Sequence, residues 1–142
     1  MSKAVTFDWF TEARSEDVPR QLRLIERLRA GVPFKELAQV IERLGLSQDE
    51  AAQVLHIPAR TLARRKENAS RLAQGEGERF LRFVKLLSLA HDTLGSMAAA
   101  KAWMGRENRA LGGATPMSLL DTDIGTRAVE DVLGRIEYGI HS

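Results

Sequence analysis

The stretch SQDEAAQVLHIPARTLARRK, residues 47–66, has the pattern of two short helices joined by a tight turn. Ser47 is a favourable N-cap residue, and Glu50 three positions later completes a capping-box sequence for the first helix. Pro58 suits the first turn of the second helix. His56 stands where such a turn often has glycine, because the backbone there tends toward positive φ, which histidine tolerates better than most residues.

The second predicted helix is basic, with several cations and no acid among them. Arg60 and Arg64 are four residues apart and therefore share a face. A basic helix after a tight turn is typical of a helix-turn-helix unit, whose second helix enters the DNA major groove and which usually binds as a homodimer on paired half-sites. The start of the first helix is placed to hold a phosphate. The predicted DNA contacts are Ser47, Gln48, Arg60, Thr61, Arg64, Arg65 and Lys66; the alternative is a solvated charged face.

Helical periodicity continues upstream of this unit. Leu22, Ile25 and Leu28 recur at helical spacing before Gly31, and a second amphipathic helix is predicted over residues 33–44. Residues 1–17 hold three aromatic residues and are predicted to form an N-terminal arm, which either caps the edge of the domain or serves as an interaction arm. We expect the helix-turn-helix domain to span residues 18–74.

Downstream, residues 75–142 are predicted to form a second, small helical domain. Gly75 and Gly77 predict a connector, and the apolar run over residues 80–94 predicts a buried helix. A further helix is expected over residues 96–104, then a loop with sharp turns, and a last helix capped by Thr122 or Asp123. The apolar stripe of that last helix is predicted to be Ile124, Ala128, Val132, Leu133, Ile136 and Ile140. No strand pattern is found, so the predicted fold is all-α.

Composition excludes several classes of protein. The chain has 142 residues, no cysteine, and 44% hydrophobic against 28% charged residues, which is typical of a globular protein in a reducing compartment. No apolar run is long enough to span a bilayer, so we expect a cytoplasmic protein without a membrane partner. The three histidines share no ligand spacing, and no nucleophile or nucleotide-binding motif is present. We therefore expect no enzyme activity, no metal and no cofactor.

Charge is divided unevenly along the chain. Residues 1–90 hold 16 basic against 12 acidic residues, whereas residues 91–142 hold 5 against 7. A basic half followed by a mildly acidic half indicates two tasks on one chain.

A spaced series in the second half resembles a known family. The series runs AWM over 102–104, NRALGG over 108–113, TP over 115–116, LL over 119–120, then Thr122, Gly125, Val129, VL over 132–133 and IEYGI over 136–140. It is similar to the Xre/MbcA/ParS toxin-binding domain of antitoxins from type II toxin–antitoxin pairs. The upstream helices resemble the Xre-type DNA-binding part of the same proteins, and the resemblance covers about residues 34–142.

The resemblance implies a function for each half. The C-terminal domain would bind a cognate RES-domain toxin that degrades NAD⁺ and cover its active site, while the N-terminal domain would repress the shared operon. Toxin contact would fall on the 103–116 segment and on the last helix with its tail. The expected toxin-binding residues are Trp103, Asn108, Arg109, Leu111, Gly112, Pro116, Tyr138, Ile140, His141 and Ser142.

Two alternatives stay open at this point. In one alternative, Trp103 and the Leu-Gly-Gly turn that begins at Leu111 have only a structural role: the tryptophan packs the small domain and the glycines allow its chain to turn. The whole chain also fits a helix-turn-helix transcription regulator whose second domain senses a small ligand or only dimerises.

Overall fold

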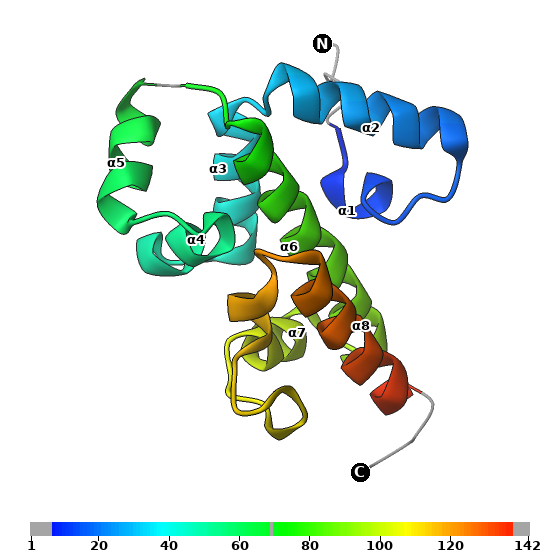
Figure 1. The fold of residues 1–142 in the computed structure, drawn as a ribbon. Helices are drawn as coiled ribbons and strands as arrows, with labels where there is room; N and C mark the ends of the chain where they lie inside the picture. Colours follow the sequence, from blue (N-terminus) through cyan, green and yellow to red (C-terminus); the bar gives the residue numbers. More distant parts are fainter. Residues whose placement is uncertain (1–6, 69, 138–142) are drawn as a thin grey trace.

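The computed structural model describes residues 7–68 and 70–137, and within these ranges every regular element is a helix (Figure 1). The only pairing of strand type in this part of the chain is an isolated antiparallel bridge between Pro33 and Arg71. The prediction of an all-α fold is confirmed. The elements are α1 Trp9–Glu12, α2 Val18–Ala30, α3 Phe34–Leu44, α4 Gln48–Leu55, α5 Ala59–Asn68, α6 Gln74–Leu94, α7 Met97–Met104, the 3₁₀ turns η1 Arg109–Leu111 and η2 Pro116–Leu119, and α8 Asp123–Glu137.

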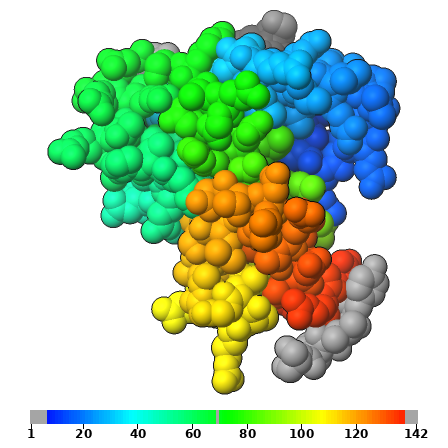
Figure 2. Space-filling model, viewed as in Figure 1, coloured from blue at the N-terminus to red at the C-terminus, as the bar shows by residue number. Residues whose placement is uncertain are grey.

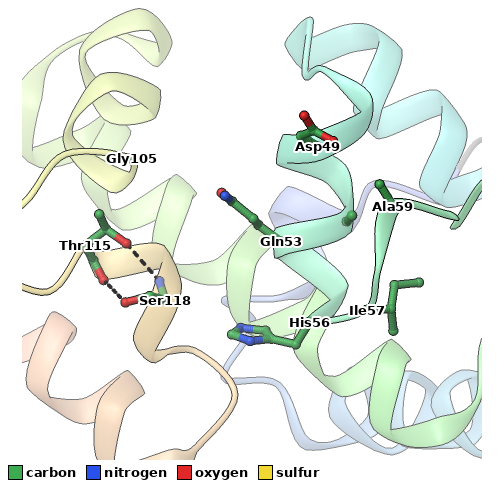
Figure 3. A pocket seen from close by; sticks show the side chains of 9 residues that line it. Asp49, Gln53, His56, Ile57, Ala59, Gly105, Thr115 and Ser118 are labelled. Atoms are coloured by element: carbon green, nitrogen blue, oxygen red, sulfur yellow. Dashed lines mark hydrogen bonds between the residues drawn. The ribbon is translucent and has the colours of Figure 1, made fainter. Parts of the chain in front are cut away.

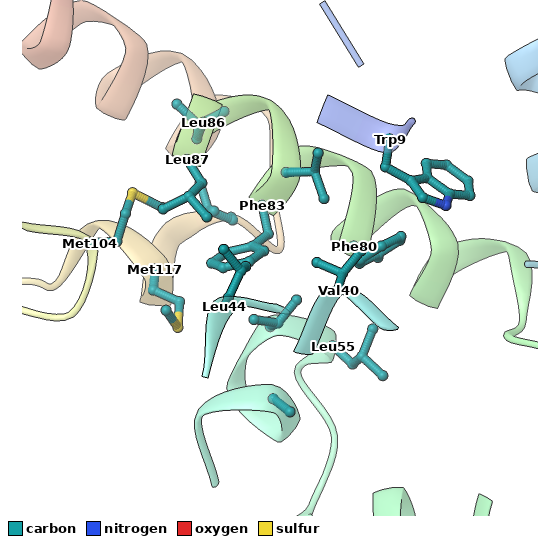
Figure 4. Packing of buried hydrophobic residues seen from close by; sticks show 14 of the residues in the cluster. Trp9, Val40, Leu44, Leu55, Phe80, Phe83, Leu86, Leu87, Met104 and Met117 are labelled. Atoms are coloured by element: carbon teal, nitrogen blue, oxygen red, sulfur yellow. The ribbon is translucent and has the colours of Figure 1, made fainter. Parts of the chain in front are cut away.

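The long helix α6 runs through the middle of the molecule and contacts α1, α2, α4, α7 and α8 (Figure 1). Phe80, Phe83 and Leu87 on α6 are fully buried. They belong to one cluster of buried side chains with Val40, Leu44 and Leu55 of the first half and Met104 and Met117 of the second half (Figure 4). The two halves of the chain therefore share one hydrophobic core around α6.

The expected connector at residues 75–77 is wrong, because these residues form the first turn of α6. The carboxylate of Glu76 accepts a hydrogen bond from the backbone N–H of Ala73 at 2.8 Å and so caps the start of the helix. A Cβ atom on Gly77 would lie 3.3 Å from Leu28 Cδ2. Glycine at this position therefore lets α6 lie close to Leu28 of α2.

The capping box and the turn predicted for the helix-turn-helix unit are both present in the structure. Ser47 and Glu50 form a reciprocal capping box at the start of α4, and His56 adopts a left-handed conformation with φ of 54° at its end. His56 is the one residue other than glycine with positive φ in the described part of the chain. The expected positive φ is confirmed.

Cations from later in the chain bind the carboxyl ends of three earlier helices. Arg71 donates to the carbonyl of Gly31 at 2.8 Å, Arg79 donates to the carbonyl of Leu55 at 3.1 Å, and Lys101 donates to the carbonyl of Leu44. Terminal carbonyls lack partners within their own helix, and the helix dipole makes them favourable sites for cations. These contacts tie the end of α2 to the segment before α6, the end of α4 to α6, and the end of α3 to α7.

Two predicted apolar stripes are partly wrong. On α2 the buried residues are Leu24 and Leu28, whereas Leu22 is 56% exposed, because the helix turns a different face toward α6. On α8, Ile124 is 77% exposed, and the core is made by Val129, Val132 and Leu133. Ile140, the last residue of that predicted stripe, lies outside the described residues.

The N-terminal segment packs on the central helix. Trp9 is buried, and its ring meets that of Phe80 edge-on at 5.1 Å. Arg14 forms an ion pair with Asp92 on α6, and its hydrogen bond lowers the pKa of the Asp92 carboxyl. Of the two alternatives for this segment, these contacts match the capping of the domain edge.

The two glycines of α8 make a matched pair for testing the packing. A Cβ atom at Gly125 would overlap the carbonyl oxygen of Leu119 and approach its carbonyl carbon to 2.9 Å, whereas a Cβ at Gly134 meets nothing within 4 Å. We expect Gly125→Ala to lower the free energy of unfolding by about 2 kcal/mol or more, since backbone must move. Gly134→Ala should raise it by about 0.5–1 kcal/mol, since alanine favours the helix. Urea denaturation followed by circular dichroism measures both, and equal effects would contradict this account of Gly125.

Candidate nucleic-acid interface and partner-binding segment

The unit formed by α4, its turn and α5 buries one face and exposes the other. Ala51, Ala52, Val54 and Leu55 of α4 are buried, whereas Leu62 is the only buried residue of α5. In Figure 1, α5 lies at the outer edge of the molecule, away from α6. A short helix held by a single buried leucine presents most of its surface to solvent, as a DNA-reading helix requires.

The predicted DNA-contacting residues lie on α5 and at the start of α4, and one of them, Arg65, forms an ion pair inside the fold. Arg60, Arg64 and Lys66 are exposed on α5, and Thr61 is half-buried. Ser47 and Gln48 are exposed at the start of α4, and the side chain of Gln48 donates to the carbonyl of Ala59 at 3.4 Å, joining the starts of α4 and α5. Their contact with DNA remains a prediction.

Arg65 differs from the other cations of α5 because its guanidinium is used inside the fold. Its Nη1 lies 2.6 Å from a carboxylate oxygen of Glu76, whose side chain is 8% exposed, and 3.4 Å from the carbonyl of Arg71. This ion pair ties α5 to the start of α6. The acid that balances Arg65 lies eleven residues away in sequence, in the first turn of α6, where a connector was expected.

The predicted toxin-binding segment forms an ordered loop between α7 and α8. The backbone N–H groups of Asn108 and Gly113 donate to the carbonyls of Ala114 and Asn108 at 3.1 and 2.9 Å, and the side chain of Asn108 accepts from the N–H of Ala110. Gly112 has φ of 68°, which glycine adopts at low cost. In the space-filling view, residues near 105–112, coloured yellow, project from the end of the molecule opposite α2 (Figure 2).

The predicted contacts in this segment divide into buried and exposed residues. Trp103 is 9% exposed and Pro116 is buried, so in the free chain both pack the domain, and Leu111 is half-buried. Arg109 and Gly112 are exposed. Tyr138, Ile140, His141 and Ser142 lie outside the described residues. The interface itself remains a prediction, carried by the exposed part of the loop.

A cleft of about 690 Å³ lies between the two units (Figure 3). One wall comes from the α4–turn–α5 unit, and the other from Gly105, Thr115 and Ser118 of the second half. No sequence pattern predicts this cleft, because its walls are more than forty positions apart in the chain and share no motif.

Other chemistry is not supported by the described residues. Across residues 7–68 and 70–137, no group of three or more histidine, aspartate or glutamate side chains is arranged to hold a metal ion. No helix in this part of the chain is long and apolar enough to cross a membrane.

Comparison with known proteins assigns a family to each half of the chain. The family model of the antitoxin Xre-like helix-turn-helix domain matches residues 23–85, and that of the antitoxin Xre/MbcA/ParS C-terminal toxin-binding domain matches residues 89–139. The two matches meet within α6. The fold and these matches define a helix-turn-helix protein with a toxin-binding domain.

Relatives of similar length agree with this assignment. "Antitoxin Xre" of Yersinia enterocolitica is 31% identical over 120 residues, which cover 84% of this chain and 81% of the relative. "Antitoxin Xre" of Photorhabdus laumondii is 32% identical, covering 81% of this chain and 78% of the relative. "Prs ADP-ribosylating antitoxin" of a Sphingobium species is 26% identical, covering 79% and 76%. The chain belongs to the Xre antitoxin family, which is non-enzymatic, and the expectation that it is not an enzyme is confirmed.

The different roles of two neighbouring arginines give a testable prediction. Arg65→Ala leaves Glu76 buried without its cation, so we expect the free energy of unfolding to fall by about 2 kcal/mol, less than for a fully buried pair because Arg65 is 30% exposed. Arg64→Ala removes an exposed side chain and should leave stability unchanged within about 0.5 kcal/mol. Urea denaturation distinguishes the two variants. Equal stability of both would show that the ion pair with Glu76 does not hold α5.

Proposed function

We propose that this chain is an antitoxin that binds and neutralises a cognate RES-domain, NAD-degrading toxin and represses its own operon through DNA binding. The observation that carries the proposal is the presence, on one rigid core around α6, of an exposed basic helix and a segment matched by the toxin-binding family model. DNA and toxin would then be bound at separate surfaces of one cytoplasmic protein.

The DNA-binding half of the proposal rests on the charge and placement of α5. Arg60, Arg64 and Lys66 supply exposed cations for phosphates and base edges, and Thr61 supplies a hydroxyl. Arg65 contributes by holding α5 at a fixed angle to α6 through Glu76, whether or not it also reaches a phosphate. A homodimer would place two such helices on paired half-sites.

The toxin-binding half rests on the ordered loop between α7 and α8. Buried Trp103 and Pro116 anchor the loop, so that exposed Arg109 and Gly112 are presented in a fixed geometry. A preorganised loop loses little conformational entropy when it binds a partner. The last helix and its tail, with Tyr138, Ile140, His141 and Ser142, would complete the surface that covers the active site of the toxin.

The chemistry of the toxin has two candidates. The family resemblance points to NAD⁺ degradation, whereas one relative bears the name "Prs ADP-ribosylating antitoxin". Both reactions consume NAD⁺, and they differ in whether ADP-ribose becomes attached to a protein. The alternative for the whole chain, a regulator whose second domain senses a ligand or only dimerises, predicts no toxin in the neighbouring gene.

Operator binding should depend on α5. The double variant Arg60→Ala and Arg64→Ala removes two exposed cations from one face, and we expect it to abolish the gel shift of the promoter DNA of its own operon at physiological salt. Affinity of the unaltered chain should also fall steeply with added salt, because each phosphate contact releases counterions. Toxin binding should not change. A flat salt response, or a retained gel shift in the double variant, would remove α5 from the DNA interface.

Neutralisation should depend on the loop between α7 and α8. When the chain is co-expressed with the product of the adjacent gene, the two should co-purify and cellular NAD⁺ should be preserved. Arg109→Glu reverses an exposed charge on η1 and should weaken the complex about tenfold or more, whereas Arg23→Glu, an exposed residue on distant α2, should not. NAD⁺ measurement together with a protein ADP-ribosylation blot identifies the toxin chemistry. Loss of NAD⁺ despite co-expression would overturn the proposal.

A further inference from the structure

The cleft between the two units has a lining unlike that of the DNA-reading surface. Its lining includes the apolar residues Ala52, Ile57 and Ala59, and its polar side chains are those of Asp49, Gln53, His56, Thr115 and Ser118. In Figure 3 the side chains of Gln53 and His56 point from α4 and its turn toward the wall that carries Thr115 and Ser118. Hydrogen-bonding groups therefore face one another across a cavity that is large enough for several side chains.

We infer that this cleft receives a segment of the toxin that carries a lysine or arginine side chain, so that the toxin-binding surface extends from the second half of the chain onto α4. This inference rests on the proposed function, because it takes the toxin as the partner. It adds a contact surface in the helix-turn-helix unit, which is outside the residues matched by the toxin-binding family model.

The negative charge of Asp49 in the cleft lining favours a cationic side chain as the group that binds there. Asp49 is the one residue with a full charge at neutral pH in the lining and is exposed at its wall. A carboxylate in the lining of a cleft attracts a cationic side chain. The exposed cations that suit phosphate, Arg60, Arg64 and Lys66, do not line the cleft.

Hydrogen-bonding capacity at the cleft is suited to a polypeptide. Thr115 and Ser118 are bonded to each other, with Ser118 Oγ donating to the carbonyl of Thr115 at 2.7 Å, so the oxygen of Ser118 keeps its capacity to accept a further bond. Backbone N–H groups and a cationic side chain are donors from which the hydroxyl oxygen of Ser118 can accept a hydrogen bond.

Position links the cleft to the segment expected to bind the toxin. The ordered loop that presents Arg109 and Gly112 begins at Gly105 and ends at Thr115, and Ser118 follows it. All three of these flanking residues line the cleft. A partner bound on that loop needs only a short extension of its own chain to enter the cleft. The cleft therefore adjoins both ends of the loop that is expected to bind the toxin.

The test uses the full-length chain and the purified product of the adjacent gene. Asp49→Lys reverses the only full charge of the cleft, and Gln53→Arg places a bulky cation in it. The matched controls are Glu42→Lys and Gln74→Arg, exposed residues that do not line the cleft. Circular dichroism and thermal denaturation verify folding, titration calorimetry measures toxin binding, and a gel shift measures operator binding.

We expect both cleft variants to raise the Kd for the toxin at least tenfold, the controls to change it less than twofold, and neither cleft variant to lose operator binding. If the unaltered chain does not bind the toxin, the proposed function fails and this inference fails with it. If the unaltered chain binds and the folded cleft variants bind equally well, the inference alone is overturned. Loss of operator binding with intact toxin binding would also overturn it, because the cleft would then belong to the DNA surface.

Discussion

Burial of the central helix α6 is the constraint on which the rest of the structure depends. Its residues Phe80, Phe83, Val84, Leu86, Leu87 and Ala90 are all 0–1% exposed, and full burial of a large apolar side chain contributes about 1.5–3 kcal/mol. One helix cannot bury apolar residues on several sides unless elements pack around it. The helices of both halves do so, which places the DNA-reading and partner-binding surfaces on one core.

Charged side chains then fix the elements around that core. Arg79 and Lys101 bind the carboxyl ends of α4 and α3, and Arg65 pairs with Glu76 at the start of α6. Each contact satisfies groups that would otherwise lose hydrogen bonds on burial. As a consequence, the exposed cations of α5 and the ordered loop between α7 and α8 have defined positions relative to each other. The cleft between the helix-turn-helix unit and the second half has defined walls as well.

Much of the fold was predictable from sequence because its signals are local. The capping box of Ser47 and Glu50, the left-handed His56 and the helical periodicity each depend on residues a few positions apart. The errors arose where partners are distant. Leu22 and Leu24 are equally apolar, and only the approach of α6 decides that Leu24 is buried; Gly77 looks like a connector until Leu28 is placed beside it.

The sequence by itself determined the all-α class and the helix-turn-helix pattern, since local spacing carries these features. The series over residues 102–140 also resembled the antitoxin family, to which the family models assign the chain. Tertiary structure decided how individual side chains are used. It paired Arg65 with Glu76, buried Trp103, left Ile124 exposed and brought Asp49 within one cleft with Ser118. Such outcomes depend on contacts between residues far apart in the chain, and no local pattern encodes which of two similar side chains will find a partner.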